Sequence, residues 1–420
     1  MPINKLENTK SPKGTIDLYY NDYNKISYYK TQLENIFIQE GGIGLETPVF
    51  EQREILLNKY NEEAETKLVF NLEDNGSDDA EKYTLRYDLT IPKIRFIKSK
   101  SIDKARIYSI GKVYRRDNPS AGRFREFYQA DFDIIGEDSS NLINELILLK
   151  MASNFIKKNN LGSFKILIND TENLKCILTR IFNYSQKSNI ELDNKKFKSI
   201  CSTIDKLDKY SFDKLRQEFI SKGLTQEQVE MLEKILSDNK YSNQESEKKI
   251  TKLIEMSKQF GFDSNIKFTP YLARGLNYYN GIIFEIILDN FGSTIISGGR
   301  YNGLIDSMSL IGISFGLSRM LDLLVYPNQN KWKSIYMLTT ISKSISLENK
   351  LNICSKLETK FNINIMISSE HDEKKLVKTI TSCVQKYIKY LFVVAPDELE
   401  KGQIILKDLE NSTQELVELE

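Results

Sequence analysis

Arginines and carboxylates are concentrated in residues 107–136, the part of the chain whose side chains are best suited to chemistry. A turn of Asx, proline and glycine at 117–122 lies in the middle of this segment. The arginines beside it are Arg115, Arg116, Arg123 and Arg125. Arginine binds phosphate and carboxylate groups in a bidentate manner, and the chain is otherwise rich in lysine. The segment therefore predicts a site for an anionic ligand.

The flanking residues 107–116 and 126–135 predict two antiparallel strands, because both are rich in β-branched and aromatic side chains. Alternate side chains of a strand point to opposite faces. One face of the second strand carries Phe127, Gln129, Asp131 and Asp133. The other carries Tyr128, Ala130, Phe132 and Ile134, which we expect in the core. An amphipathic hairpin with one solvated face is the usual alternative.

Composition narrows the class of protein. A chain of 420 residues, with 40% hydrophobic and 28% charged residues, indicates a globular protein of two or three domains. The net charge of +1 means that a nucleic acid would have to bind to local patches. The four cysteines show no C-x-x-C spacing, and the single histidine, His371, excludes multi-histidine metal sites. We therefore predict no bound structural metal and no histidine-based acid–base catalysis.

Two features predict a cytoplasmic protein. No apolar run approaches the roughly 20 residues that cross a bilayer. The first residues, MPINKLENTK, lack the apolar core of a signal peptide.

The hydrophobic periodicity and the positions of glycine and proline predict two domains. Residues 1–330 combine an antiparallel sheet with helices at 17–39, from 91, 141–158 and 316–325, and with strands at 68–72, 83–89 and 164–168. A charge-rich helical insertion is expected at about 171–265. Strands and helices then alternate in residues 331–420, which predicts an α/β domain with a largely parallel sheet. The fold class is therefore α+β, followed by a smaller α/β domain.

No phosphate-binding glycine loop of the P-loop or G-x-G-x-x-G type is present. Arg115, Arg274 and Arg319 are the candidates for holding a phosphate, since each lies beside an expected strand or helix end. No nucleophile with an adjacent base is evident. Attack of a carboxylate on a phosphate needs neither, because positioning and electrostatic stabilisation are enough.

Several of these segments, in order, resemble the class II aminoacyl-tRNA synthetases. Y-R-R-D-N-P followed by G-R-F-R-E-F-Y-Q-A-D-F-D resembles their motif 2, G-I-S-F-G-L-S-R at 312–319 their motif 3, and the stretch around Pro48 their motif 1. L-R-Y-D-L-T at 85–90 and A-R-G-L-N-Y-Y-N-G at 273–281 are similar to histidyl-tRNA synthetases of the eukaryotic and archaeal form. The resemblance runs from near Gly14 to the C-terminal domain and is weak in the insertion.

The resemblance implies a class II catalytic domain and a C-terminal anticodon-binding domain. It implies a homodimer that activates L-histidine with ATP and transfers it to the 3′ end of histidine tRNA. A magnesium ion would bridge the outer phosphates of ATP, and no metal would be held by the protein itself.

The resemblance also implies residue roles. Arg115 and Arg274 would be catalytic, contacting the α-phosphate. ATP would be bound by Arg115, Arg123, Arg274 and Arg319. The histidine pocket would consist of Asp88, Thr90, Gln129, Asp133, Tyr278 and Tyr279. Purely structural roles are the alternatives for Asp88, as a cap of the following turn, and for one of the two tyrosines, as core. For Arg300 in G-G-R-Y-N-G, the structural alternative is that it only braces its loop.

Other functions remain open at this point. A non-catalytic relative, acting as a regulatory subunit or as a sensor of uncharged tRNA, is the chief alternative. Such relatives tend to lose the arginines that this chain keeps. An RNA-binding scaffold fits poorly with the near-neutral charge. The chain has Asn277 where the family usually has aspartate.

The assignment of Arg274 to the phosphate predicts a separation of binding from chemistry. Arg274→Ala should lower histidine-dependent exchange of pyrophosphate into ATP by about 100-fold or more, because it removes a charge that stabilises the transition state. Histidine affinity, measured by calorimetry, should change little. A collapse of histidine affinity would instead assign Arg274 to the amino acid.

Overall fold

The computed structural model describes residues 9–57, 68–72, 83–120, 122–137, 140–184, 193–238, 240, 242–273, 279–305, 308–326, 333–368 and 373–419. The chain divides into two compact units, Met1–Val325 and Tyr326–Glu420. The expected boundary at 330/331 falls in residues 327–332, outside the described part. No helix of the described residues has the length and apolar character required to cross a membrane.

An eight-stranded sheet forms the centre of the first unit, with strand order β1-β4-β5-β10-β9-β8-β6-β7. All neighbouring strands are antiparallel except β1 with β4 and β6 with β7 at the two edges. The strands in that order are Ile43–Gly44, Ala105–Tyr114, Glu126–Ile135, Leu310–Phe315, Thr294–Arg300, Ile282–Leu288, Phe164–Asp170 and Ile266–Phe268. The predicted α+β class with an antiparallel sheet is confirmed.

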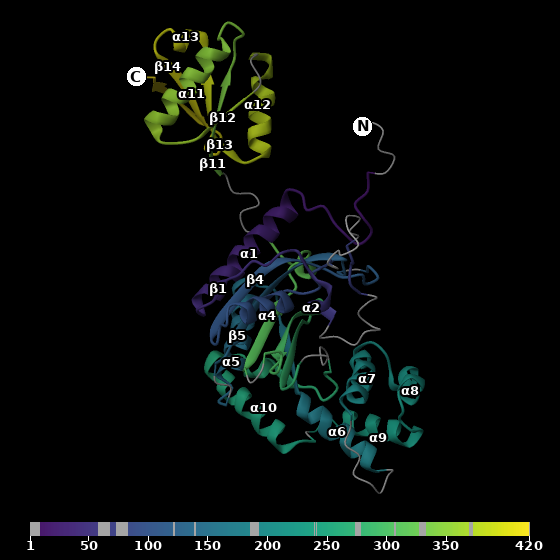
Figure 1. The fold of residues 1–420 in the computed structure, drawn as a ribbon. Helices are drawn as coiled ribbons and strands as arrows, with labels where there is room; N and C mark the ends of the chain where they lie inside the picture. Colours follow the sequence, from purple (N-terminus) through teal and green to yellow (C-terminus); the bar gives the residue numbers. More distant parts are fainter. Residues whose placement is uncertain are drawn as a thin grey trace. The chain divides into compact units, whose positions relative to one another are not determined.

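One face of the sheet is covered by α1 (Asn21–Gln39) and α5 (Ile143–Lys158), and α10 (Gln244–Ser257) packs against α5 and β6 (Figure 1). Aromatic rings fill this core: the Phe37 ring lies 5.4 Å from that of Phe132 and 5.8 Å from that of Phe315. Ala130, Phe132 and Ile134 all belong to the cluster. The alternation predicted for the second hairpin strand is therefore correct.

The opposite face contacts α4 (Thr90–Ser99), which places Ile94 and Ile97 against Ile107 and Ile135. Shorter elements nearby are β2 (Phe50–Gln52), α2 (Arg53–Leu57) and β3 (Tyr83–Leu85). This face also carries the polar side chains described below.

The charge-rich region folds into helices with their own hydrophobic cluster. They are α6 (Thr171–Tyr184), α7 (Asn194–Ile204), η2 (Asp205–Asp208), α8 (Phe212–Ser221) and α9 (Gln226–Ser237). The next helix, α10, instead buries Ile250 and Leu253 in the core of the sheet. By packing, the separate helical cluster therefore runs from α6 to α9. Two short turns, η3 (Lys258–Phe260) and η4 (Asp263–Asn265), lead back to β7.

The second unit has a five-stranded sheet of order β12-β11-β13-β14-β15. The first three strands are parallel, and β14 and β15 are antiparallel additions. The strands in that order are Ile365–Ile367, Lys333–Thr340, Ile388–Val394, Gln403–Asp408 and Thr413–Glu418. The helices are α11 (Leu347–Phe361), α12 (Glu373–Gln385) and α13 (Pro396–Leu399). The strand β15 has no counterpart in the prediction.

The helix predicted at 316–325 is wrong, since only a 3₁₀ turn, η5 (Ser318–Met320), forms there. Most backbone N–H groups of this segment donate to the carbonyl three residues back, so no run of α-helical bonds develops. The turn is tied to the sheet, because Tyr128 N donates to Ser318 Oγ (2.9 Å) and Arg319 Nη1 donates to Thr294 O (2.6 Å). Arg319 therefore lies in a 3₁₀ turn and not at the start of an α-helix.

Other element boundaries also differ from the prediction. The first helix begins at Asn21 rather than at residue 17. Residues 68–72 make only an isolated bridge, Asn71 to Thr84, and β3 ends at Leu85 rather than at residue 89. The residue types at 68–72 and 86–89 favour strands, but a strand forms only where a neighbouring strand is available for hydrogen bonding.

The core face of β5 should be sensitive to truncation. Phe132→Ala should lower the free energy of unfolding by about 3–5 kcal/mol, because it leaves a cavity among packed aromatic rings. Ile38→Ala, on the exposed side of α1, should change it by less than about 0.5 kcal/mol. Urea unfolding followed by circular dichroism gives both values, and equal effects would contradict this packing.

Candidate active site

The strands β5 and β10 form the floor of a cavity of about 330 Å³ on the face opposite the main core. Gln129, Asp131 and Asp133 all line it, so the prediction that they share one face is confirmed. Asp133 lies beside Gly312 of β10 and Asp131 beside Ser314. A Cβ atom at Gly312 would stand 2.1 Å from Asp133 Oδ1, so the missing side chain leaves room for this carboxylate.

The walls of the cavity come from segments far apart in sequence. Between β3 and α4 lie Tyr87 and Asp88, and Thr90 begins α4. Leu272, Tyr279 and Glu285 come from the segment around β8, and Tyr301 follows β9. Arg274 and Tyr278, predicted to belong here, lie outside the described residues, as do Asn277 and His371.

Asp133 is held by two buried donors. The Lys93 ammonium of α4 makes an ion pair with Asp133 Oδ2, and the Tyr301 hydroxyl donates to Oδ1. Lys93 has no exposed side-chain surface, and Asp133 is 2% exposed. Burial, and next the charge of Asp133, raise the pKa of Tyr301 well above its ordinary value, so this phenol is a hydrogen-bond donor at neutral pH. The two donors therefore hold the carboxylate in a fixed position at the base of the cavity.

Sequence reasoning missed both partners of Asp133. Lys93 lies within the apolar run Ile91-Pro92-Lys93-Ile94, and a lysine on the buried side of a helix is a usable signal. Tyr301 belongs to the glycine-rich stretch G-G-R-Y-N-G, whose pattern indicates only a loop. The buried acid Glu285 was also missed, although it is the one charge in the strand I-I-F-E-I-I-L.

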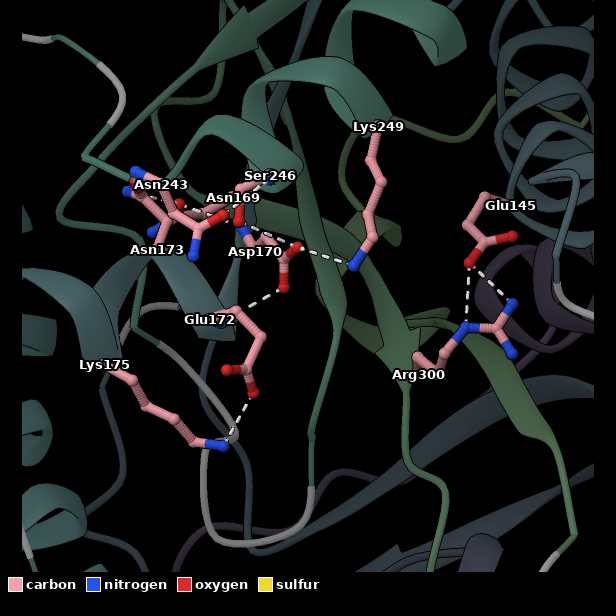
Figure 2. A network of polar contacts seen from close by, with 10 residues as sticks. All are labelled: Glu145, Asn169, Asp170, Glu172, Asn173, Lys175, Asn243, Ser246, Lys249 and Arg300. Carbon is pink, nitrogen blue, oxygen red and sulfur yellow. Dashed lines mark hydrogen bonds and ion pairs between the residues drawn. The ribbon is translucent and has the colours of Figure 1, made fainter. Parts of the chain in front are cut away.

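Asp88 caps the following turn and also lines the cavity. Its Oδ1 accepts from Ile91 N at 3.0 Å and so stabilises the first turn of α4, while its side chain also lines the cavity. Arg300 in contrast is structural. Its guanidinium donates to Glu145 Oε1 (2.6 Å from Nη2) and to Ser309 Oγ (2.8 Å), and it does not line this cavity (Figure 2).

Arg115 links this cavity to a second one of about 250 Å³, because it lines both. Its Nε donates to Tyr87 O at 3.2 Å, and its guanidinium lies 4.3 Å from the Tyr87 ring centre. Arg123 and Arg319 line the second cavity. With Glu285 they also line a third cavity of about 460 Å³, where Asp205, Asp208 and Lys209 of the helical cluster contribute.

The other two arginines of the hairpin have different surroundings. Arg116 is exposed, and Arg125 Nε donates to Asp117 O at 3.2 Å within the loop. The site thus has an acidic half over β5 and a basic half at the hairpin loop. It suits a ligand set that carries ammonium or imidazole groups at one end and phosphates at the other.

Asp131 is a buried carboxyl of the cavity with a raised pKa. Burial raises its pKa from the usual 3.8 to about 7; Lys93 lowers it, Asp133 and Asp88 raise it, and a hydrogen bond with Ser314 lowers it. Its Oδ1 is buried and has no hydrogen-bond partner among the described residues, and the same holds for Gln129 Oε1. These atoms are acceptors available to a ligand.

The family model described as Histidyl-tRNA synthetase matches residues 14–324. The chain belongs to this family. It is 34% identical to a probable cytoplasmic histidine–tRNA ligase of Vairimorpha ceranae over 97% of each chain. It is 30% identical to that of Encephalitozoon cuniculi, over 98% of this chain and 96% of the relative. Both the recognition from the sequence motifs and the class II fold are confirmed.

The crystal structure of histidyl-tRNA synthetase from Nostoc sp. PCC 7120 is similar, with a TM-score of 0.70. It is 22% identical and covers 98% of this chain and 97% of its own, so this likeness concerns the fold alone. A Bacillus halodurans structure titled as an ATP phosphoribosyltransferase regulatory subunit/histidyl-tRNA synthetase has the same TM-score at 17% identity. The fold alone therefore does not separate an enzyme from a regulatory relative, whereas the two relatives of 30% and 34% identity over nearly the whole chain are named as histidine–tRNA ligases.

The pKa of Asp131 predicts a pH-dependent stability. Its folded-state pKa is raised, so between pH 3.8 and about 7 the folded protein binds more protons than the unfolded chain, and stability falls as pH rises. Asp131→Asn removes this dependence. The unfolding free energy of the variant minus that of the wild type should therefore rise between pH 5 and 7, by up to about 1.4 kcal/mol per pH unit, and level off above about pH 8. Urea unfolding at several pH values measures it, and a flat difference would contradict it.

Proposed function

We propose that the chain is a histidine–tRNA ligase that forms histidyl-adenylate from L-histidine and ATP and passes the histidyl group to histidine tRNA. The observation that carries the proposal is the position of Arg115, which lines both the carboxylate-rich cavity and the arginine-lined cavity. One guanidinium at the junction of an amino-acid pocket and a nucleotide pocket can contact both reacting groups.

The first step needs no general base. The histidine carboxylate oxygen attacks the α-phosphorus of ATP, the bond to the β-phosphate oxygen breaks, and pyrophosphate leaves. Negative charge develops on the α-phosphate, where Arg115 and Arg274 stabilise it. Arg123 and Arg319 hold the remainder of ATP in the second cavity.

Histidine would occupy the first cavity. Its ammonium group is bound by Asp88, Thr90 and Gln129, and its imidazole by Asp133 with Tyr278 and Tyr279. The support for this orientation is that Asp133, fixed by Lys93 and Tyr301, lines the first cavity and does not line the arginines' cavity. A pocket built to hydrogen-bond a substrate group rejects analogues that lack it by about 10⁴–10⁵.

A magnesium ion on the outer phosphates fits the site. Among the described residues no group of three or more His, Cys, Asp or Glu could hold a metal ion by itself. Magnesium commonly binds through substrate phosphates, waters and one or two carboxylates. Glu285, which lines the first and third cavities, is the residue that would contact it, and the bound ion would neutralise charge on the departing pyrophosphate.

The enzyme is proposed as a cytoplasmic homodimer, like relatives whose names place them in the cytoplasm. The edge strand β1 and the segment after it expose Ile43, Val49 and Phe50, an apolar surface that a second copy could cover. Residues 331–420 are proposed to bind the anticodon of the tRNA.

Histidine-dependent exchange of pyrophosphate into ATP tests the proposal against the chief alternative, a non-catalytic regulator or sensor of uncharged tRNA. The purified protein should exchange label when histidine, ATP and magnesium are all present. Omission of histidine is the control. Folded protein that binds histidine but shows no exchange above this control would support the regulator instead.

Arg115 and Arg116 offer a matched pair for the same assay. Arg115→Ala should lower kcat/KM for exchange by about 100-fold or more, because it removes a charge from the α-phosphate. Arg116→Ala, which removes an exposed arginine one residue away, should change kcat/KM by less than about threefold. Similar losses in both variants would show that loop charge in general, rather than Arg115, supports the reaction.

A further inference from the structure

Asn169, near the end of β6, is completely buried and uses its whole amide group. Its Nδ2 donates to Pro270 O and to Leu272 O, each at 3.1 Å. Its Oδ1 accepts from Asp170 N at 2.9 Å and from Asn173 Nδ2 at 3.3 Å (Figure 2). The partners fix the orientation of the amide, because two carbonyls require the NH₂ group and a backbone N–H requires the oxygen.

The residues that Asn169 holds lie outside the regular sheet. The strand β7 pairs with β6 from Ile266 to Phe268. The next residue, Thr269, donates its N–H to Ile168 O at 2.9 Å. Beyond Thr269, the two hydrogen bonds from the Asn169 side chain hold the backbone against β6 in place of strand pairing. An asparagine is required for this arrangement, since aspartate would present a charged acceptor to two carbonyl oxygens.

This segment forms part of the candidate active site. Leu272 lines both the first and the third cavity, and Tyr271 lines the third. Ala273, which is buried, directly precedes Arg274 in the chain. The position of Leu272 O therefore fixes where the chain leaves the sheet toward Arg274.

We infer that Asn169 is a positioning residue for adenylation: it holds residues 270–273, and so sets the cavity wall at Leu272 and the start of the segment that carries Arg274. The inference rests on the proposed function for the role of Arg274. Asn169 itself lines none of the three cavities and acts only through the backbone that it binds.

The same polar network supplies a control. Asp170, also buried, accepts from Ser246 Oγ at 3.0 Å and from Lys249 Nζ at 3.4 Å (Figure 2). Ser246 is as buried as Asn169, and its side chain makes no bond to residues 270–273 among the contacts of the described residues. Ser246→Ala therefore disturbs the network without touching the held segment.

The test compares the full-length variants Asn169→Asp and Ser246→Ala with the wild type. For Asn169→Asp we expect kcat for pyrophosphate exchange to fall by about 10- to 100-fold, because a small displacement of a catalytic group is costly. The histidine Kd should change less than about threefold, because Leu272 contributes an apolar wall and none of the proposed hydrogen bonds to histidine. Amide hydrogen exchange in residues 266–273 should become faster. Ser246→Ala should leave the exchange kcat and these amide rates near those of the wild type.

Three results would overturn the inference: Asn169→Asp that binds histidine and keeps its kcat within about twofold, equal losses in both variants, or unchanged amide exchange in residues 266–273. If Asn169→Asp does not fold, Asn169→Ser is judged by the same criteria. If the wild type itself shows no pyrophosphate exchange, the proposed function fails, and the amide exchange rates alone decide whether Asn169 holds this segment.

Discussion

The strand β5 must bury apolar side chains on one face and present polar side chains to the cavity on the other, and the rest of the first unit depends on this constraint. Phe132 and its alternating neighbours must be covered by helices, so α1 and α5 pack there. The side chains between them, including Asp131 and Asp133, must then face the opposite side of the same sheet. A shift of one residue in register would place carboxylates in an aromatic core, so the fold and the site are specified together.

Buried charges on the second face are kept by pairing. Lys93 and Asp133 would each be costly to bury alone, but the ion pair and the hydroxyl of Tyr301 compensate them. The buried Arg300–Glu145 ion pair is a similar case, but it joins α5 to β9 and does not line the first cavity. Asp131 has weaker compensation and a pKa near neutrality. A buried carboxyl that lines a cavity and has a strongly raised pKa marks a candidate functional site.

Much of the layout of the candidate site could be predicted because it depends on local rules. Strand parity alone brought Gln129, Asp131 and Asp133 to one face, and turn chemistry located the arginine loop between two strands. The predicted helix at 316–325 failed for a tertiary reason. Its apolar spacing was adequate, but contacts of Ser318 and Arg319 with the sheet favoured a tighter turn than an α-helix. The end of the helical cluster was likewise a question of packing, since α10 joins the core of the sheet.

The sequence by itself determined the family, the antiparallel hairpin, the face on which its carboxylates lie and the arginines that surround the loop. These follow from residue types at short spacing, which strand geometry converts directly into position. Only the tertiary structure decided that Lys93 and Tyr301 hold Asp133, that Arg115 joins two cavities, and that Asn169 fixes residues 270–273. Those contacts join segments from about 40 to nearly 170 residues apart, and no local pattern encodes which distant partner a buried polar group will meet.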